Sequence, residues 1–216
     1  MMAGDALELG GERVAVGKLQ VALLGSARQL QGDLDRIADR ADTTTTEGLH
    51  YVLQETVLAL QRNPDYWVYG ATELQFERGY DEAEAVFNEL SLGERSKFRS
   101  ETLSNFAGDS RAKDMGLKYV VSNNVYLVML MCYAHRGMPE PGSSELIVVT
   151  ILVAADVALK LPKINSREDL RTALNRIGSV PEQSIVAVEV LWTPQDPNDY
   201  YTRDEVMADY PTLAIL

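Results

Sequence analysis

The chain has 216 residues, of which 46% are hydrophobic and 24% charged, a composition typical of a globular protein of one large domain. It carries 20 Lys and Arg against 32 Asp and Glu, a formal net charge of −12, which argues against nucleic-acid binding. One cysteine and two histidines exclude a disulfide framework and a thiolate metal cage. The longest apolar runs, at 125–134 and 146–155, are shorter than the roughly 20 residues of a spanning helix, so we expect no membrane span in this chain.

The N-terminal part of the sequence predicts a strand, two helices and a second strand. Residues 1–12 show no signal-peptide pattern and are predicted to be a flexible terminus. Alternating apolar residues predict a strand over 12–24, and apolar residues three and four apart predict a helix over 27–41. Thr44 and Glu47 have the spacing of a capping box that begins the second helix. That helix ends at Asn63-Pro64-Asp65, and the aromatic stretch 66–69 predicts a short strand.

The middle of the sequence gives weaker patterns. Gly79 opens a third helical region, and the capping-box spacing of Ser91 and Glu94 predicts a separate helix to about residue 105. The run 125–134 fits either a strand or a buried helix, which periodicity cannot separate. We interpret residues 107–144 as a variable insertion in the domain.

The C-terminal part predicts two strands and two helices. The β-branched run 146–155 predicts a central strand that is buried on both faces. A helix over 166–178 follows, then a strand over 185–193 and a short helix from Thr202 that ends before Pro211.

Together these elements predict the fold class α+β. We expect a small mixed or antiparallel sheet of about four or five strands, with helices packed mainly on one face. Residues 13–216 are predicted to form a single domain.

No spacing in the sequence predicts a catalytic, cofactor or metal site. His50 and His135 are 85 residues apart, and Cys132 lies in an apolar run where a thiol usually packs as a small hydrophobe. Phosphate-binding glycine motifs are absent from the sequence. Five carboxylates between Asp196 and Asp209 leave three interpretations open, namely a carboxylate enzyme site, weak cation binding and a solvated turn.

Two turns are candidates for a partner-binding surface, because each combines an aromatic residue, a proline and a carboxylate. The alternative is that both are packed turns. The candidate residues are Asn63, Pro64, Asp65, Tyr66, Trp192, Pro194, Asp196 and Asp199.

Several blocks of the sequence, in the same order, resemble the domain-of-unknown-function 1517 family of cyanobacteria and chloroplasts. The blocks are 18–28, 33–43, 47–69, 87–105, 145–177, 187–199 and 204–211. This resemblance implies an association with thylakoid or plastid-envelope membranes and a role in adjusting photosynthesis to changing light. It implies no catalytic residues, because no biochemical activity is established for the family.

From the resemblance we expect a non-catalytic regulatory or assembly factor that binds a protein of a thylakoid membrane complex, with no cofactor and no nucleic-acid partner. It would lie in the chloroplast stroma or on the stromal face of the thylakoid, or on the cytoplasmic face in a cyanobacterium. One alternative is a stably bound peripheral subunit of a photosystem or other pigment–protein complex, docked through residues 117–134. The other alternative is an enzyme with a carboxylate site near Asp196–Asp209.

Overall fold

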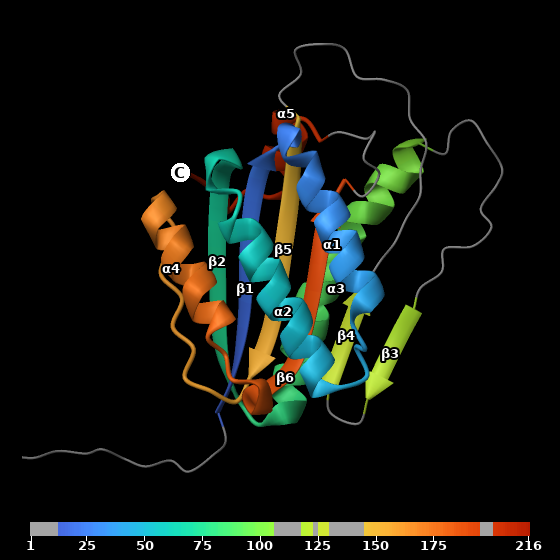
Figure 1. The fold of residues 1–216 in the computed structure, drawn as a ribbon, viewed down its shortest axis with the longest axis vertical. Coiled ribbons are helices and arrows are strands. Elements are labelled where there is room, and N and C mark those ends of the chain that lie inside the picture. Colours follow the sequence, from blue (N-terminus) through green and yellow to red (C-terminus); the bar gives the residue numbers. More distant parts are fainter. Residues whose placement is uncertain (1–12, 106–117, 123–124, 130–144, 195–200) are drawn as a thin grey trace, which may run out of the picture.

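The structure is a computed structural model, and it describes residues 13–105, 118–122, 125–129, 145–194 and 201–216. Its main feature is an antiparallel sheet with the strand order β6-β5-β1-β2-β7 (Figure 1). The strands are β1 (Arg13–Leu24), β2 (Trp67–Arg78), β5 (Leu146–Ala155), β6 (Ile185–Thr193) and β7 (Ala214–Ile215). A separate two-stranded sheet pairs β3 (Lys118–Ser122) with β4 (Val125–Met129).

Strand β1 is central, paired along nearly its whole length with β2 on one side and with β5 on the other. Because side chains alternate between the faces of a sheet, its odd and even residues enter different layers. Leu19 and Val21 point to one face, whereas Lys18 and Gln20 point to the other. Both faces of β1 are therefore covered, which explains why so many of its residues are buried.

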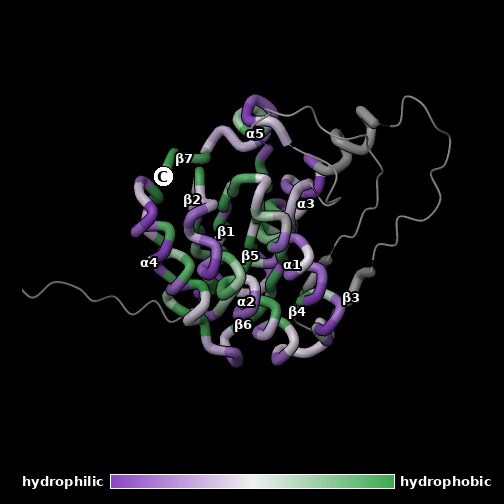
Figure 2. The backbone as a smooth tube through the Cα atoms, turned by 45° about the horizontal axis from the view of Figure 1, so that its top comes forward, coloured by the Kyte–Doolittle hydropathy of each residue, from purple (hydrophilic) through white to green (hydrophobic). Residues whose placement is uncertain are grey.

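Three helices cover one face of the sheet, namely α1 (Arg28–Arg40), α2 (Thr46–Gln61) and α4 (Arg167–Gly178) (Figure 1). Their apolar stripes, including Leu34, Leu53 and Leu174, join the apolar side chains of the strands in the largest buried cluster. The polar sides of these helices face outward, so the tube in Figure 2 alternates between hydrophobic and hydrophilic along each helix.

The opposite face is covered by the long helix α3 (Tyr80–Asn105) and the short helix α5 (Arg203–Asp209). Phe87 of α3 packs against Val14 and Val16 of β1, and Val206 of α5 packs against Val148 of β5. The turn from β2 into α3 depends on Gly79, whose φ of 104° lies in the region that residues with a Cβ rarely adopt. Three short 3₁₀ turns complete the fold at Gly25–Ala27, Pro64–Tyr66 and Glu182–Ser184.

The predicted fold class is confirmed, since one open antiparallel sheet of five strands packs against five helices and three of these share one face.

Three local predictions were wrong. Strand β2 continues to Arg78 rather than ending at Tyr69. Helix α3 runs unbroken through Ser91 and Glu94 instead of restarting there. The N-cap of α2 is Thr45, whose hydroxyl accepts from the Gly48 amide at 3.0 Å.

The predicted insertion at 107–144 lies largely outside the described residues, as does the flexible terminus 1–12. Within the ambiguous apolar stretch 117–134, residues 118–122 and 125–129 form the strands of the small sheet. Helix α4 begins, as its sequence predicts, at the cap Ser166, and α5 begins at a full capping box between Thr202 and Glu205.

Candidate functional site

The first predicted partner turn, Asn63–Tyr66, connects the end of α2 to β2. Asp65 is exposed, and the other three residues are half-buried. Arg167 of α4 holds the turn by donating to the backbone carbonyls of Pro64 at 3.3 Å and Trp67 at 3.2 Å. The turn is therefore fixed against the neighbouring helix, and its carboxylate points to solvent.

The second predicted turn begins inside the core. Trp192 is 1% exposed and packs among the residues of the largest cluster. Pro194 is also buried, and its carbonyl accepts from the side-chain amide of Gln31 in α1 at 2.6 Å. Asp196 and Asp199 lie outside the described residues.

The two turns lie at the same end of the sheet. Trp67 is opposite Leu23 of β1, and Trp192 is opposite Val149 of β5. Strands β1 and β5 lie between β2 and β6, so the strands that carry Trp67 and Trp192 are about 14 Å apart at the usual spacing between neighbouring strands. The described residues of the two predicted turns thus lie at one end of the sheet without forming one contiguous cluster.

A layer of charged side chains lies between α3 and the sheet, and no sequence pattern predicted it. Glu189 of β6 is fully buried, and its Oε1 accepts from Arg95 Nε at 2.9 Å. The second carboxylate oxygen has no hydrogen-bond partner among the described residues. Burial raises the pKa of Glu189, and the Arg95 guanidinium and the Ser91 hydroxyl oppose that rise.

The same layer continues on β1 and β2 around Lys18. Its ammonium group lies 2.7 Å from Glu73 and 3.7 Å from the buried Glu94. Lys97 donates to the other oxygen of Glu94 at 2.8 Å and lies 3.9 Å from the centre of the Tyr210 ring. The proximity of Lys18 lowers the pKa of Glu73. The alternation of Lys18 with apolar neighbours in the strand was the available signal for a buried charge.

Among the described residues, no group of three His, Cys, Asp or Glu side chains could hold a metal ion. In the acidic C-terminal segment, Glu205 is engaged in the capping box of α5, and Asp209 accepts a hydrogen bond from the Tyr201 hydroxyl. His50 lies on α2 with its ring beside the Gln54 amide. Of the carboxylates that suggested an enzyme, Glu205 and Asp209 thus have local structural partners, and Asp196 and Asp199 lie outside the described residues.

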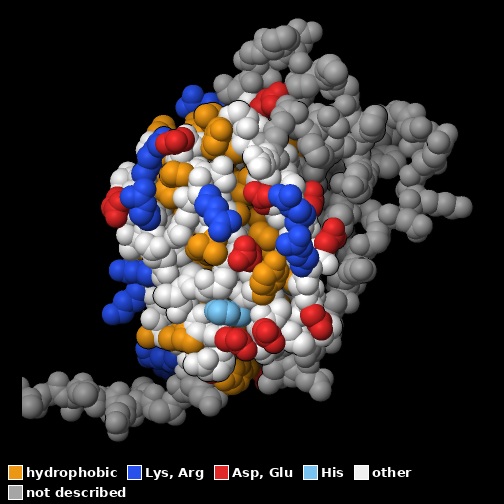
Figure 3. Space-filling model, in the orientation of Figure 1, with side chains coloured by type: hydrophobic (Ala, Val, Ile, Leu, Met, Phe, Trp, Pro, Cys, Tyr) orange, Lys and Arg blue, Asp and Glu red, His pale blue; other side chains and the backbone are white. Residues whose placement is uncertain are grey.

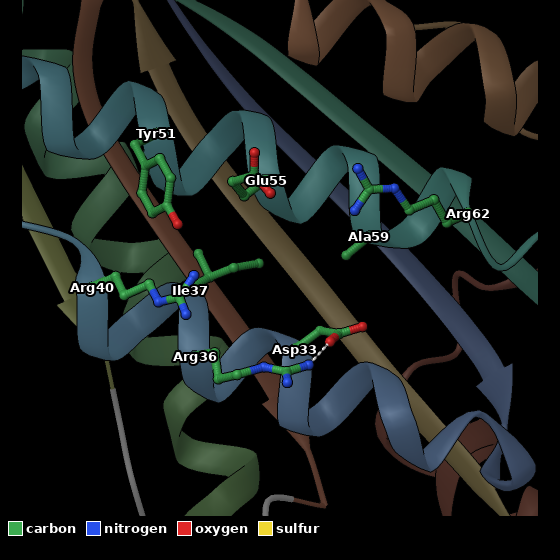
Figure 4. Close-up of a pocket in the computed structure, with 8 residues that line it drawn as sticks. All are labelled: Asp33, Arg36, Ile37, Arg40, Tyr51, Glu55, Ala59 and Arg62. Atoms are coloured by element: carbon green, nitrogen blue, oxygen red, sulfur yellow. Dashed lines mark hydrogen bonds and ion pairs between the residues drawn. The ribbon is translucent and has the colours of Figure 1, made fainter.

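An open groove of about 240 Å³ runs between α1 and α2 (Figure 4). Buried Ile37 and Ala59 lie at its base, one from each helix. The sides are polar and are formed by Asp33, Arg36, Arg40, Tyr51, Glu55 and Arg62. The sequence placed Arg36 off the apolar stripe of α1 but did not predict the groove. The groove forms only where α1 packs against α2, and this packing cannot be read from the sequence of either helix.

The three arginines of the groove differ in their partners. Arg36 donates to Asp33, which lies three residues earlier in the same helix. The side chains of Arg40, Arg62 and Glu55 form no ion pair or hydrogen bond with any described residue. In Figure 4, Arg40 of α1 and Arg62 at the end of α2 extend toward the groove from its opposite ends. Figure 3 shows Lys and Arg side chains interspersed with Asp and Glu on this face of a strongly acidic molecule.

A family model with the description "Protein of unknown function (DUF1517)" matches residues 13–216. The chain belongs to this family. No solved structure matches it.

Two curated relatives are similar over almost the whole chain. "FLUCTUATING-LIGHT-ACCLIMATION protein 1, chloroplastic" of Arabidopsis thaliana is 41% identical over 209 residues, covering 97% of this chain and 48% of the relative. "Protein FLAP1 homolog A" of Synechocystis is 39% identical over 204 residues, covering 94% of this chain and 57% of the relative. The chain thus spans about half the length of these DUF1517 relatives. In the part that the structure describes, no helix has both the length and the apolar character needed to cross a membrane.

Proposed function

We propose that this chain is a non-catalytic regulatory or assembly factor in the acclimation of photosynthesis to changing light. The observation that carries the proposal is the similarity to two relatives whose names refer to fluctuating-light acclimation, one from a plant and one from a cyanobacterium. Their similarity extends over nearly all of this chain, so the domain itself is shared rather than a short motif. The proposed location is the chloroplast stroma or the stromal face of the thylakoid, or the cytoplasmic face in a cyanobacterium.

The proposed mode of action is binding to a protein of a thylakoid membrane complex. The rigid turn Asn63–Tyr66 is the described part of the proposed surface. Its backbone is held by Arg167, so the exposed Asp65 and the half-buried Tyr66 are presented without a large ordering cost. Asp196 and Asp199 belong to the same proposed surface.

A segment exchange tests the role in light acclimation. In a Synechocystis strain lacking the FLAP1 homolog A, the relative is restored either intact or with this chain in place of its matching segment. Chlorophyll fluorescence is then recorded under constant and under alternating light. We expect the exchanged protein to restore the response to alternating light, and a stable exchanged protein that restores nothing contradicts the proposal.

A second measurement separates a regulator from a permanent subunit. Native gels of the same membranes are probed for the exchanged protein, with Asp65→Lys as the surface variant. Asp204→Lys is the matched control, because it reverses an exposed carboxylate on α5, which lies on the face of the sheet opposite to α2 and α4. We expect Asp65→Lys alone to reduce the amount of the exchanged protein that co-migrates with the complex. Complete co-migration with one complex under all light conditions favours the alternative of a stably bound subunit.

A further inference from the structure

We propose that the groove between α1 and α2 binds a small phosphomonoester that also carries an amino group. This site is independent of the partner surface at the turn Asn63–Tyr66 and goes beyond the proposed role in light acclimation. The side chains of Arg40 and Arg62 have no partner among the described residues. Single exposed arginines are common, but these two line one groove from different helices.

The arginines supply donors suited to a phosphate. A guanidinium carries five N–H donors in a planar fork and binds phosphate oxygens in pairs. Arg36 uses Nη2 for Asp33, which leaves donors on its other nitrogens. The groove therefore combines two free guanidinium groups with a third that is held in place by a carboxylate.

The charge of the groove also favours an anion. Its three arginines exceed its two carboxylates, Asp33 and Glu55, by one charge, although the whole chain carries −12. When a cationic group of the ligand neutralises Glu55, the excess of positive charge in the groove increases to two. A local cationic site on an acidic protein binds a small anion at short range, since charges beyond about 8 Å are largely screened at physiological salt.

Glu55 defines the second group of the ligand. Its carboxylate lies on α2 between Tyr51 and Ala59, facing the groove, and has no described partner (Figure 4). A purely anionic ligand would be repelled by it, whereas an ammonium group would pair with it. The Tyr51 hydroxyl at the same side offers a further hydrogen-bond donor or acceptor.

The volume of the groove limits the size of the ligand. At about 240 Å³ it is smaller than the pockets of roughly 300–1,000 Å³ that hold drug-sized molecules. A phosphate joined to a short carbon chain with an amine has a suitable size, and phosphoethanolamine is the simplest such compound.

A titration of the 216-residue chain with two probes, monitored through its amide NMR signals, tests the site. The probes are inorganic phosphate and phosphoethanolamine at pH 7, with sodium chloride keeping the ionic strength constant. We expect saturable shifts confined to amides of α1 and α2, with phosphoethanolamine binding more tightly than phosphate. Shifts that do not saturate, or that spread over the whole surface, overturn the proposal.

Four variants locate the binding. Arg40→Gln and Arg62→Gln should each weaken binding of both probes about tenfold, as expected for the loss of a charged hydrogen-bond donor. Arg171→Gln is the matched control, because it removes one exposed arginine from α4 on the same face, and it should leave both affinities within about twofold. Equal weakening by Arg171→Gln would show general charge attraction and overturn the site.

Glu55→Gln distinguishes the two parts of the ligand. It should strengthen phosphate binding, because a like charge leaves the groove. It should also abolish the preference for phosphoethanolamine, since the amine loses its partner. A preference that survives Glu55→Gln overturns the assignment of the amino group.

Discussion

Glu189 combines complete burial with a charged partner, and this pair sets a pH dependence at the scale of one residue. Its pKa is raised in the folded protein because burial disfavours the carboxylate. The folded state therefore holds a proton over a pH range in which the unfolded state has released it. In that window, from the unfolded pKa upward to the folded value, this residue lowers the free energy of unfolding as pH rises.

Substitution of Glu189 by Gln removes this titration and keeps the shape of the side chain. We expect the free energy of unfolding of Glu189→Gln, relative to the native protein, to increase with pH above about 4.5 and then to level off. Urea denaturation between pH 4 and 8 measures the difference. A difference that is constant over this range would show that Glu189 does not titrate differently in the folded state.

The partner of Glu189 gives the complementary prediction. Arg95→Met leaves a buried carboxylate without its cation, and we expect a loss of about 3 kcal/mol at pH 7, at the lower end of the range for broken buried pairs because Arg95 is 18% exposed. The double variant Glu189→Gln with Arg95→Met should recover most of the loss. Urea denaturation of the four proteins gives the coupling, and additive effects would contradict a direct interaction.

At the scale of the element, two glycines of the helical layer are predicted to behave in opposite ways. A Cβ on Gly48 would lie 1.8 Å from the Asp42 carbonyl oxygen, because the loop before α2 crosses its first turn there. A Cβ on Gly32 of α1 would meet nothing within 4 Å. We expect Gly48→Ala to destabilise the protein by more than about 2 kcal/mol, and Gly32→Ala to stabilise it by about 0.5–1 kcal/mol. Thermal unfolding measures both, and equal effects would contradict the close approach at Gly48.

The sequence predicted elements well where one strong pattern acts alone. The apolar alternation of β1 and the β-branched run of β5 identified both strands to within about a residue. The outer half of β2 was missed because β7 pairs with it only at Tyr69 and Gly70, leaving a half-exposed strand with little apolar alternation. Tertiary packing was the other reason for error, as the false helix start in α3 shows. Ser91 and Glu94 have the spacing of a cap, but they face the buried charges of the sheet.

The candidate sites could likewise be predicted only where they depend on local sequence and not on tertiary packing. The turn Asn63–Tyr66 is local in sequence, so its composition could be recognised without the fold. The burial of Trp192 depends on helices far away in the chain, and no local pattern predicts it. The groove of Arg40 and Arg62 likewise arises from the packing of α1 on α2, which single-sequence periodicity does not specify.

At the scale of the whole molecule, the topology predicts one cooperative unit. Strand β1 pairs with β2 from the first half of the sequence and with β5 from the second. The two tryptophans report on both parts, with Trp67 in β2 and Trp192 in β6. In single-tryptophan variants Trp67→Phe and Trp192→Phe, the fluorescence transition should coincide with the far-ultraviolet circular dichroism transition of the same variant. Separate transitions in either variant would contradict the prediction of a single domain over 13–216.

The central position of β1 has a consequence for synthesis of the protein. β1 ends at Leu24, and its neighbour β5 begins at Leu146, 122 residues later by subtraction. At about 5–20 residues per second, the ribosome needs on the order of 6–24 s to deliver that neighbour. The nascent chain therefore exposes one long apolar strand edge during this interval, with β2 available to cover only the other edge. The strand order therefore requires that this edge be protected during synthesis. A chaperone, or the helices α1 and α2 that emerge first, can protect it.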